Sequence, residues 1–194
     1  MNMTPEDLMA AHPNDVVSYW RQAGPAKWFA KDAAFDSAIA LKFEQTHYRA
    51  SMRRYDAWAQ TAEGALALLI LLDQFPRNMF RGTPHAFATD PLARTFARAA
   101  IAAGHDHDPA IDPTLRPFFY LPFEHSESLV DQEFSVQLFA ALQADTGDEE
   151  SMKWALLHRD IIARFGRFPH RNAGLGRETT AAEQEFLDEG GFAG

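Results

Sequence analysis

Thr61-Ala62-Glu63-Gly64-Ala65-Leu66-Ala67-Leu68-Leu69-Ile70-Leu71-Leu72-Asp73-Gln74 is the segment that decides the fold. Its leucines and isoleucine fall on every side of a helix. A helix that is apolar all round belongs at the centre of a domain. Gly64 within it predicts the close approach of another backbone. We therefore expect the other helices to be arranged around residues 61–74.

Several further stretches show apolar residues at helical spacing, and none shows the alternation of period two that is typical of strands. Capping residues, first-turn prolines and glycines indicate where helices start and stop. Trp28 and Phe29 fall in a loop and are interpreted as a packing anchor. The sequence predicts an all-α fold of about seven to eight helices. The expected helices start at Thr4–Pro5 and at Asn14, cover 32–54, 61–74, 90–104, 124–143 and 149–165, and end with a short one from Thr180; 113–123 is a turn or short helix.

The composition places the chain among cytoplasmic, soluble proteins. Its 194 residues are enough for one domain, so we expect a single domain over 1–194 whose last residues, 190–194, fray. The net charge of −9 disfavours nucleic acid and anionic membranes as partners. No cysteine is present, which excludes disulfides and thiolate metal sites. The longest apolar run, Ala65–Leu72, is far shorter than the roughly 20 residues that span a membrane. Met1–Asp15 lacks the apolar core of a secretory signal.

Three stretches carry more polar groups than a helical scaffold requires. The first is Asp73-Gln74-Phe75-Pro76-Arg77-Asn78-Met79-Phe80-Arg81-Gly82, which follows the most apolar helix. Asp73 is expected to be desolvated there and to need a partner, which Arg77 or Arg81 can supply, with Asn78 beside them. The same arginines suit the carboxylate or phosphate of a ligand, and capping of the helix end is the alternative.

The second stretch is Tyr120-Leu121-Pro122-Phe123-Glu124-His125-Ser126-Glu127-Ser128-Leu129-Val130-Asp131-Gln132-Glu133. Helical spacing places Glu124, Glu127 and Asp131 on one face, and acids in a first turn also suit the helix dipole. These acids either neutralise arginines elsewhere or hold a metal with a histidine. Because the spacing differs from the Glu-x-x-His of di-metal bundles, we expect no metal site and no cofactor. Acid–base catalysis by Glu124 or His125 is chemically possible.

The third stretch is Phe165-Gly166-Arg167-Phe168-Pro169-His170-Arg171-Asn172-Ala173-Gly174-Leu175-Gly176-Arg177, led in by His158 and the residues after it. Over 159–177 the arginines outnumber the acids five to one, so anionic groups elsewhere must balance them. Phe168-Pro169-His170-Arg171-Asn172 also echoes Phe75-Pro76-Arg77-Asn78, which suggests two related corners.

Two interpretations explain the arginine-rich corner. In the first, its arginines form a closed, buried ion-pair network that locks helices together, because buried charges must be paired. The acids of that network are Asp73, Glu124, Glu127 and Asp131. In the second, part of the network stays open as an anion pocket, and the glycines let backbone N–H groups approach the ligand. The residues of that pocket are Arg77, Arg167, His170 and Arg171.

Together the three stretches resemble a bacterial family, the domain of unknown function 924 family. The matching segments are Leu71–Asn78 with Arg81–Pro84, Tyr120–Glu127 with Asp131–Gln132, and Arg164–Asn172 with Gly176–Arg177; Trp20 and Trp28–Phe29 fit the aromatic N-terminal region. The resemblance covers nearly the whole chain. It implies a tetratricopeptide-like stack of helical hairpins, with repeats too degenerate to show the usual period of about 34 residues. It implies no reaction, so no catalytic residue can be transferred.

Two hypotheses of function follow. The first is a non-enzymatic helical scaffold that binds a protein or peptide partner, with a polar network that is mainly structural. The second is a binder of a small anion, phosphate or carboxylate, or an enzyme, that uses the arginine-rich corner beside Glu124, His125 and His170. Whether the chain is an enzyme, and its oligomeric state, are left open. The candidate polar site comprises Asp73, Arg77, Asn78, Arg81, Glu124, His125, Glu127, Asp131, His158, Arg167, His170, Arg171, Asn172 and Arg177.

Overall fold

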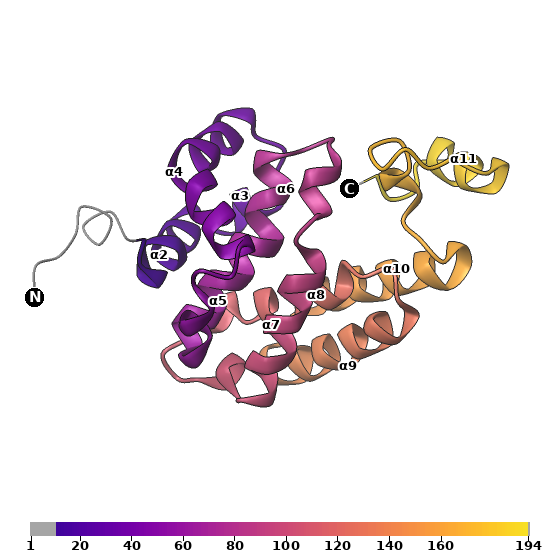
Figure 1. Cartoon of the computed structure of the whole chain (residues 1–194). Helices are drawn as coiled ribbons and strands as arrows, with labels where there is room; N and C mark the ends of the chain where they lie inside the picture. The colour runs from indigo at the N-terminus through magenta and orange to yellow at the C-terminus, as the bar shows by residue number, and fades with distance from the viewer. Residues whose placement is uncertain (1–10, 194) are drawn as a thin grey trace, which may run out of the picture.

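The computed structural model describes residues 11–193, and the helix expected to start at Thr4–Pro5 lies outside them. The described chain is all-α, as predicted, and contains no strand (Figure 1). Short 3-10 turns join many of the helices, among them η1 (Asp56–Gln60), η3 (Pro84–Phe87) and η6 (Pro169–Arg171). The α-helices are α2 (Pro13–Ala23), α3 (Pro25–Trp28), α4 (Ala33–Ser51), α5 (Ala62–Leu69), α6 (Phe75–Met79), α7 (Asp90–Ala102), α8 (Pro117–Glu124), α9 (Leu129–Thr146), α10 (Glu149–Phe165) and α11 (Ala181–Asp188).

Helix α5 lies in the middle of the N-terminal helices, as its sequence predicts. Its leucines are fully buried, and it packs against α2, α7 and α8. The hydroxyl oxygen of Thr61 caps the helix by accepting a hydrogen bond of 3.1 Å from the N–H of Gly64. A Cβ atom on Gly64 would lie 2.0 Å from the carbonyl oxygen of Trp58, which confirms the predicted close approach of another backbone.

The central helix does not end at Gln74, where the sequence analysis places its end. It widens into a π-helix, η2 (Ile70–Gln74), and continues as α6. Pro76 explains the change, because it has no N–H to donate to the preceding turn. Two carbonyl oxygens of that turn find side-chain partners instead: that of Leu71 lies 2.9 Å from Nδ1 of His47, and that of Leu72 accepts a 2.5 Å hydrogen bond from the Thr89 hydroxyl.

The predicted helix over 124–143 is wrong at its start. Helix α8 ends at Glu124, residues 125–128 form a non-helical connection, and α9 begins at Leu129. The side-chain amide of Gln132 stabilises this break by donating to the carbonyl oxygens of Glu124 and Ser126, at 2.6 and 2.7 Å. Glu124, Glu127 and Asp131 therefore do not share one helix face, and each has a different surrounding.

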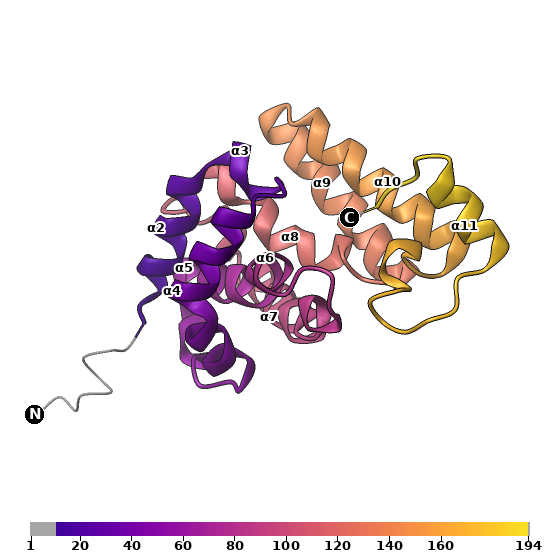
Figure 2. The same cartoon turned by 90° about the horizontal axis from the view of Figure 1, so that it is seen from above.

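The C-terminal part of the chain forms a second layer beside the N-terminal helices (Figures 1 and 2). Helices α9 and α10 form a hairpin that packs on α8. At the C-terminal end of α10, Ile161 and Ile162 form a small hydrophobic cluster with Phe168 and with Phe186 of α11, apart from the main core. The described helices include none that is long and apolar enough to cross a membrane.

Candidate functional site

Asp73 is the centre of a buried polar cluster, and the π-helix places it there. Its side chain is 1% exposed. Its carboxylate lies 2.8 Å from Nδ1 of His125 and 3.3 Å from Nη1 of Arg77, and it accepts a 2.5 Å hydrogen bond from the amide of Gln74. Burial alone would raise the pKa of Asp73, but the charges of Arg77 and His125 outweigh it and hold that pKa at about 2. Asp73 is therefore a buried carboxylate that stays ionised.

Arg77 links Asp73 to the start of α7. Its Nη1 and Nη2 atoms each donate a 3.0 Å hydrogen bond to one oxygen of Asp90, in the two-point geometry that suits a guanidinium and a carboxylate. Nη1 also donates to the carbonyl oxygen of Asp73 at 2.6 Å. Burial opposes the charge of Arg77, but Asp73 and Asp90 raise its pKa above the ordinary value. Arg77 is thus fully engaged by protein oxygens.

Glu124 and His158 form a buried pair that carries no charge near neutral pH. Oε1 of Glu124 lies 3.2 Å from Nδ1 of His158, which also lies 2.8 Å from the carbonyl oxygen of Trp154. Burial, with the nearby charge of Asp73, raises the pKa of Glu124 to about 8. Burial lowers the pKa of His158 to about 3. Oε2 of Glu124 is buried without a hydrogen-bond partner, so this carboxyl group keeps unused bonding capacity.

Arg171 reaches the same cluster from the other side, on η6. Its guanidinium carbon lies 4.5 Å from the ring centre of Phe87 and 4.4 Å from that of Phe168. Nη1 donates a 3.1 Å hydrogen bond to the carbonyl oxygen of His125, and the closest carboxylate oxygen, on Asp90, is 3.8 Å away. The buried Nε atom has no partner. Burial, with the charge of Arg77, lowers the pKa of Arg171 to about 10.

His170 precedes Arg171 and lies among aromatic rings. Its buried Nδ1 has no hydrogen-bond partner. Burial, with the charge of Arg171, lowers its pKa to about 3. The ring of Phe192 lies 5.1 Å from that of His170 and 4.5 Å from that of His158. The predicted fraying of the tail concerns motion and stays a prediction, but the described conformation places Phe192 over both histidines.

The remaining arginines of the third stretch make closed pairs outside the Asp73 cluster. Arg177 binds both oxygens of Glu127, at 2.7 and 2.9 Å. Arg167 binds both oxygens of Glu183, at 2.6 and 2.8 Å. Asn172 is fully buried beside them, and its amide donates to the Thr179 hydroxyl at 3.4 Å.

The other predicted site residues lie apart from this cluster as well. Arg81 and Asn78 both bind Asp36 of α4, with hydrogen bonds of 2.8 to 3.1 Å. Asp131 accepts a 2.7 Å hydrogen bond from Ser126 and pairs with two arginines of α7, Arg94 and Arg98. Asp131 therefore does not neutralise the arginine-rich corner. Within residues 11–193, no three histidine, aspartate or glutamate side chains converge as a metal site.

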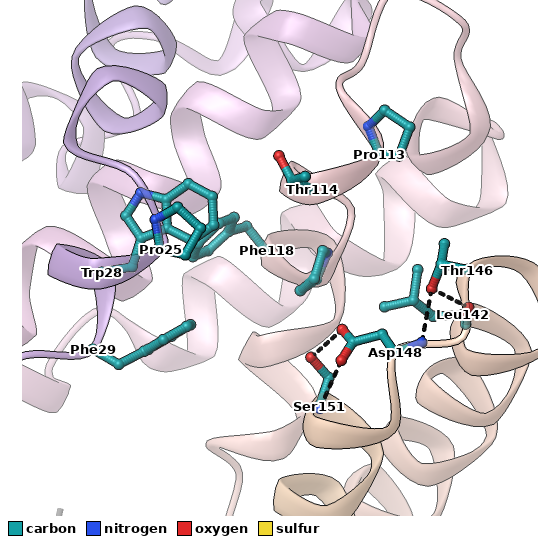
Figure 3. Close-up of a pocket in the computed structure, with 11 residues that line it drawn as sticks. Pro25, Trp28, Phe29, Pro113, Thr114, Phe118, Leu142, Thr146, Asp148 and Ser151 are labelled. Carbon is teal, nitrogen blue, oxygen red and sulfur yellow. Dashed lines mark hydrogen bonds between the residues drawn. The ribbon is translucent and has the colours of Figure 1, made fainter.

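A second candidate site is an apolar groove between α3 and the turn that joins α9 to α10 (Figure 3). It has a volume of about 360 Å³. Trp28 is buried, donates a 2.7 Å hydrogen bond to the carbonyl oxygen of Trp20 and serves as the predicted packing anchor, although it lies in α3 and not in a loop. Phe29 is different, because it is 67% exposed. We call this site the Phe29 groove; it is lined by Pro25, Trp28, Phe29, Pro113, Thr114, Pro117, Phe118, Leu142, Thr146, Asp148 and Ser151.

Comparison with known proteins identifies the family. The sequence profile described as "Bacterial protein of unknown function (DUF924)" matches residues 16–191. The chain belongs to this family. Among solved structures, the "Structure of Protein of Unknown Function ATU0120 from Agrobacterium tumefaciens" is 50% identical, with a TM-score of 0.85 over 91% of this chain and 97% of that one. No curated protein matches the chain.

The sequence analysis of this DUF924 member did not identify three acids that pair with candidate residues: Asp36, which binds Asn78 and Arg81, and the two acids Asp90 and Glu183. Asp90 precedes a proline at a helix start, so it looks like a local helix signal, and nothing near it predicts an arginine partner 13 residues earlier. Glu183 forms the predicted capping box with Thr180, and it also holds Arg167. For Asp90 and Glu183, a residue with a sufficient local role has a second, long-range one, which a local pattern cannot reveal.

Proposed function

We propose that this protein is a helical scaffold that binds a peptide segment of a partner protein in the Phe29 groove. The segment presents an apolar side chain next to a cationic one. The observation that carries the proposal is the exposed ring of Phe29 beside an apolar groove whose polar end offers oxygen acceptors (Figure 3). Aromatic residues of this kind are typical anchors of protein recognition.

The walls of the groove favour an apolar side chain. Trp28, Phe29 and Phe118 stand on one side of it, with the ring of Phe29 stacked at 6.2 Å on that of Phe118. Prolines and Leu142 supply the rest of the apolar lining. Burying such surface is the main favourable term in association. An extended or proline-rich peptide suits a groove of this kind, since such peptides dock against aromatic walls.

The polar end of the groove favours a cation. Its hydroxyl groups already donate to protein oxygens: Thr114 to Asp112 at 2.8 Å, Thr146 to the carbonyl of Leu142 at 2.7 Å, and Ser151 to Asp148 at 2.5 Å. What remains for a ligand is their lone pairs and the carboxylate of Asp148, the one charged group among the described lining residues. A lysine or arginine of the partner is complementary to this end.

The polar cluster supports a scaffold role because most of it is internally paired. Arg77, Arg167 and Arg177 each bind both oxygens of one carboxylate and tie separate elements together. The tetratricopeptide-like character of the stack and the cytoplasmic location remain predictions from the sequence. The hairpin of α9 and α10 is compatible with the first of these.

A peptide selection tests the proposal. Random peptides displayed on phage are selected against the full chain, and binders are then measured against Phe29→Ser and Asp148→Asn variants. We expect a consensus with a lysine or arginine next to an apolar residue, and at least tenfold weaker binding to both variants. Asp148→Asn is a matched change, since asparagine also caps helices and α10 stays intact. Binders that ignore both substitutions, or none at all, would refute the groove as the binding site.

A further inference from the structure

The structure assigns a second binding site to Arg171: a site for a small oxyanion, held by two coplanar hydrogen bonds from the guanidinium with His170 beside it. This goes beyond the proposed peptide groove, which lies on other elements. In one interpretation of the sequence, four residues form an anion pocket: Arg77, Arg167, His170 and Arg171. The pairing of Arg77 and Arg167 with protein carboxylates removes those two and leaves Arg171 and His170.

Arg171 differs from the other arginines of the candidate set because it binds no carboxylate; the Nε atom of Arg177 is also buried without a partner, but its two Nη atoms hold Glu127. Arg77, Arg81, Arg167 and Arg177 each bind both oxygens of a carboxylate. Arg171 makes one hydrogen bond, to a carbonyl, although its side chain is only 7% exposed. A buried guanidinium with an unpartnered Nε atom is costly unless a further acceptor reaches it.

Within residues 11–193, no carboxylate lies within hydrogen-bonding distance of Arg171. Asp90 is the closest, at 3.8 Å, and both of its oxygens are already bound by Arg77. The rings of Phe87 and Phe168 cover the guanidinium. An added ligand therefore reaches its donors in the plane of the group, which is the geometry of a two-point contact with a carboxylate or phosphate.

The neighbours of Arg171 favour an anionic ligand over a neutral one. His170 has an unpartnered Nδ1, and the ring of Phe192 lies against both His170 and His158. An oxyanion that enters here gains the charge of Arg171 and can draw a proton onto His170. The two ligand sources, carboxylate and phosphate, share the pair of coplanar oxygens that this geometry requires.

Thermal unfolding with simple anions tests the inference. The melting temperature of the full chain is measured in sodium phosphate, in sodium acetate and in sodium chloride of equal ionic strength. We expect a rise of several degrees over chloride in phosphate, in acetate or in both, as a saturating ligand produces. A rise in phosphate alone identifies a phosphate site, and a rise in acetate alone a carboxylate site. Equal melting temperatures in all three salts would overturn the inference.

Variants locate the effect. Arg171→Met should abolish the rise, and Arg171→Lys, which keeps the charge but loses the planar pair of donors, should reduce it by at least half. If the Arg171→Met variant does not fold, Arg171→Lys alone tests whether Arg171 is responsible for the rise in melting temperature. Arg81→Met is the control, because Arg81 pairs with Asp36 away from this cluster, and it should keep the full rise. A rise that persists in both Arg171 variants would also overturn the assignment.

Discussion

The two corners of this protein share a sequence pattern but differ in how their arginines are used. The first corner, residues 73–82, and the second, residues 165–177, each contain Phe-Pro followed by an arginine and an asparagine. Arg77 and Arg171 approach the same carboxylate, that of Asp90. The backbones of the corners also meet, since a Cβ atom on Gly174 would lie 3.6 Å from the carbonyl oxygen of Gly82. Of the two arginines, only Arg77 of the first corner forms hydrogen bonds with Asp90.

The difference shows that the carboxylate of Asp90 does not form hydrogen bonds with both buried guanidinium groups. Arg77 lies on α6, one turn after Asp73, and takes both oxygens of Asp90. Arg171 comes from a 3-10 turn of the C-terminal segment and reaches only 3.8 Å. The first corner therefore locks helices together, whereas the second keeps free donors. The same short sequence pattern thus has its arginine paired with a carboxylate in one place and without such a pair in the other.

The largest effect should come from breaking the first corner at its centre. Asp73→Asn removes the carboxylate shared by Arg77 and His125, and leaves a buried cation with less compensation. We expect a loss of about 3–5 kcal/mol in the free energy of unfolding, measured with urea. Asp36→Asn is the control in the more exposed pair with Arg81, and should cost about 1 kcal/mol or less. Equal losses in the two variants would show that burial of Asp73 adds nothing.

A smaller effect should appear with pH at Glu124, the buried acid beside His158. Burial raises its pKa from the ordinary 4.5 to about 8, so its stabilising contribution is complete below pH 4.5 and is lost as pH rises through 8. The contributions of His158 and His170, whose pKa values burial lowers from 6.5 to about 3, are complete above pH 6.5.

Between pH 6.5 and 8 the free energy of unfolding should therefore fall by about 2 kcal/mol. Glu124→Gln mimics the protonated acid and should remove this slope. The measurement is urea unfolding at several pH values in both proteins. If the pH dependence of the free energy of unfolding is unchanged in Glu124→Gln, a group other than Glu124 causes it.

Much of the fold could be predicted from the sequence because its signals are local. The apolar circumference of residues 61–74 predicts their central position, and Thr180 with Glu183 predicts the last helix. The break at 125–128 could not be predicted in the same way. Acids at 124, 127 and 131 keep helical spacing through it, and the break is stabilised by Gln132, which caps carbonyls up to eight residues earlier.

The candidate site could be predicted only as a set of residues, not as a set of pairs. Asp73, Arg77 and His125 meet as one cluster because desolvated acids need partners. Which arginine lacks a carboxylate partner depends on which guanidinium group the two oxygens of Asp90 bind, and this follows from the packing of α6, α7 and η6. Phe29 could not be told from Trp28 in the sequence, because exposure is set by the neighbouring helices.

The contrast between the corners is tested most directly by the paired substitutions Arg77→Met and Arg171→Met, compared by urea unfolding. Arg77→Met leaves Asp73 and Asp90 without their main cation and should cost about 3–5 kcal/mol. Arg171→Met replaces an under-compensated charge with an apolar side chain between two phenylalanine rings, and should stay within about 1 kcal/mol of the wild type. If Arg171→Met costs as much as Arg77→Met, the second corner is as structural as the first, and the contrast is wrong.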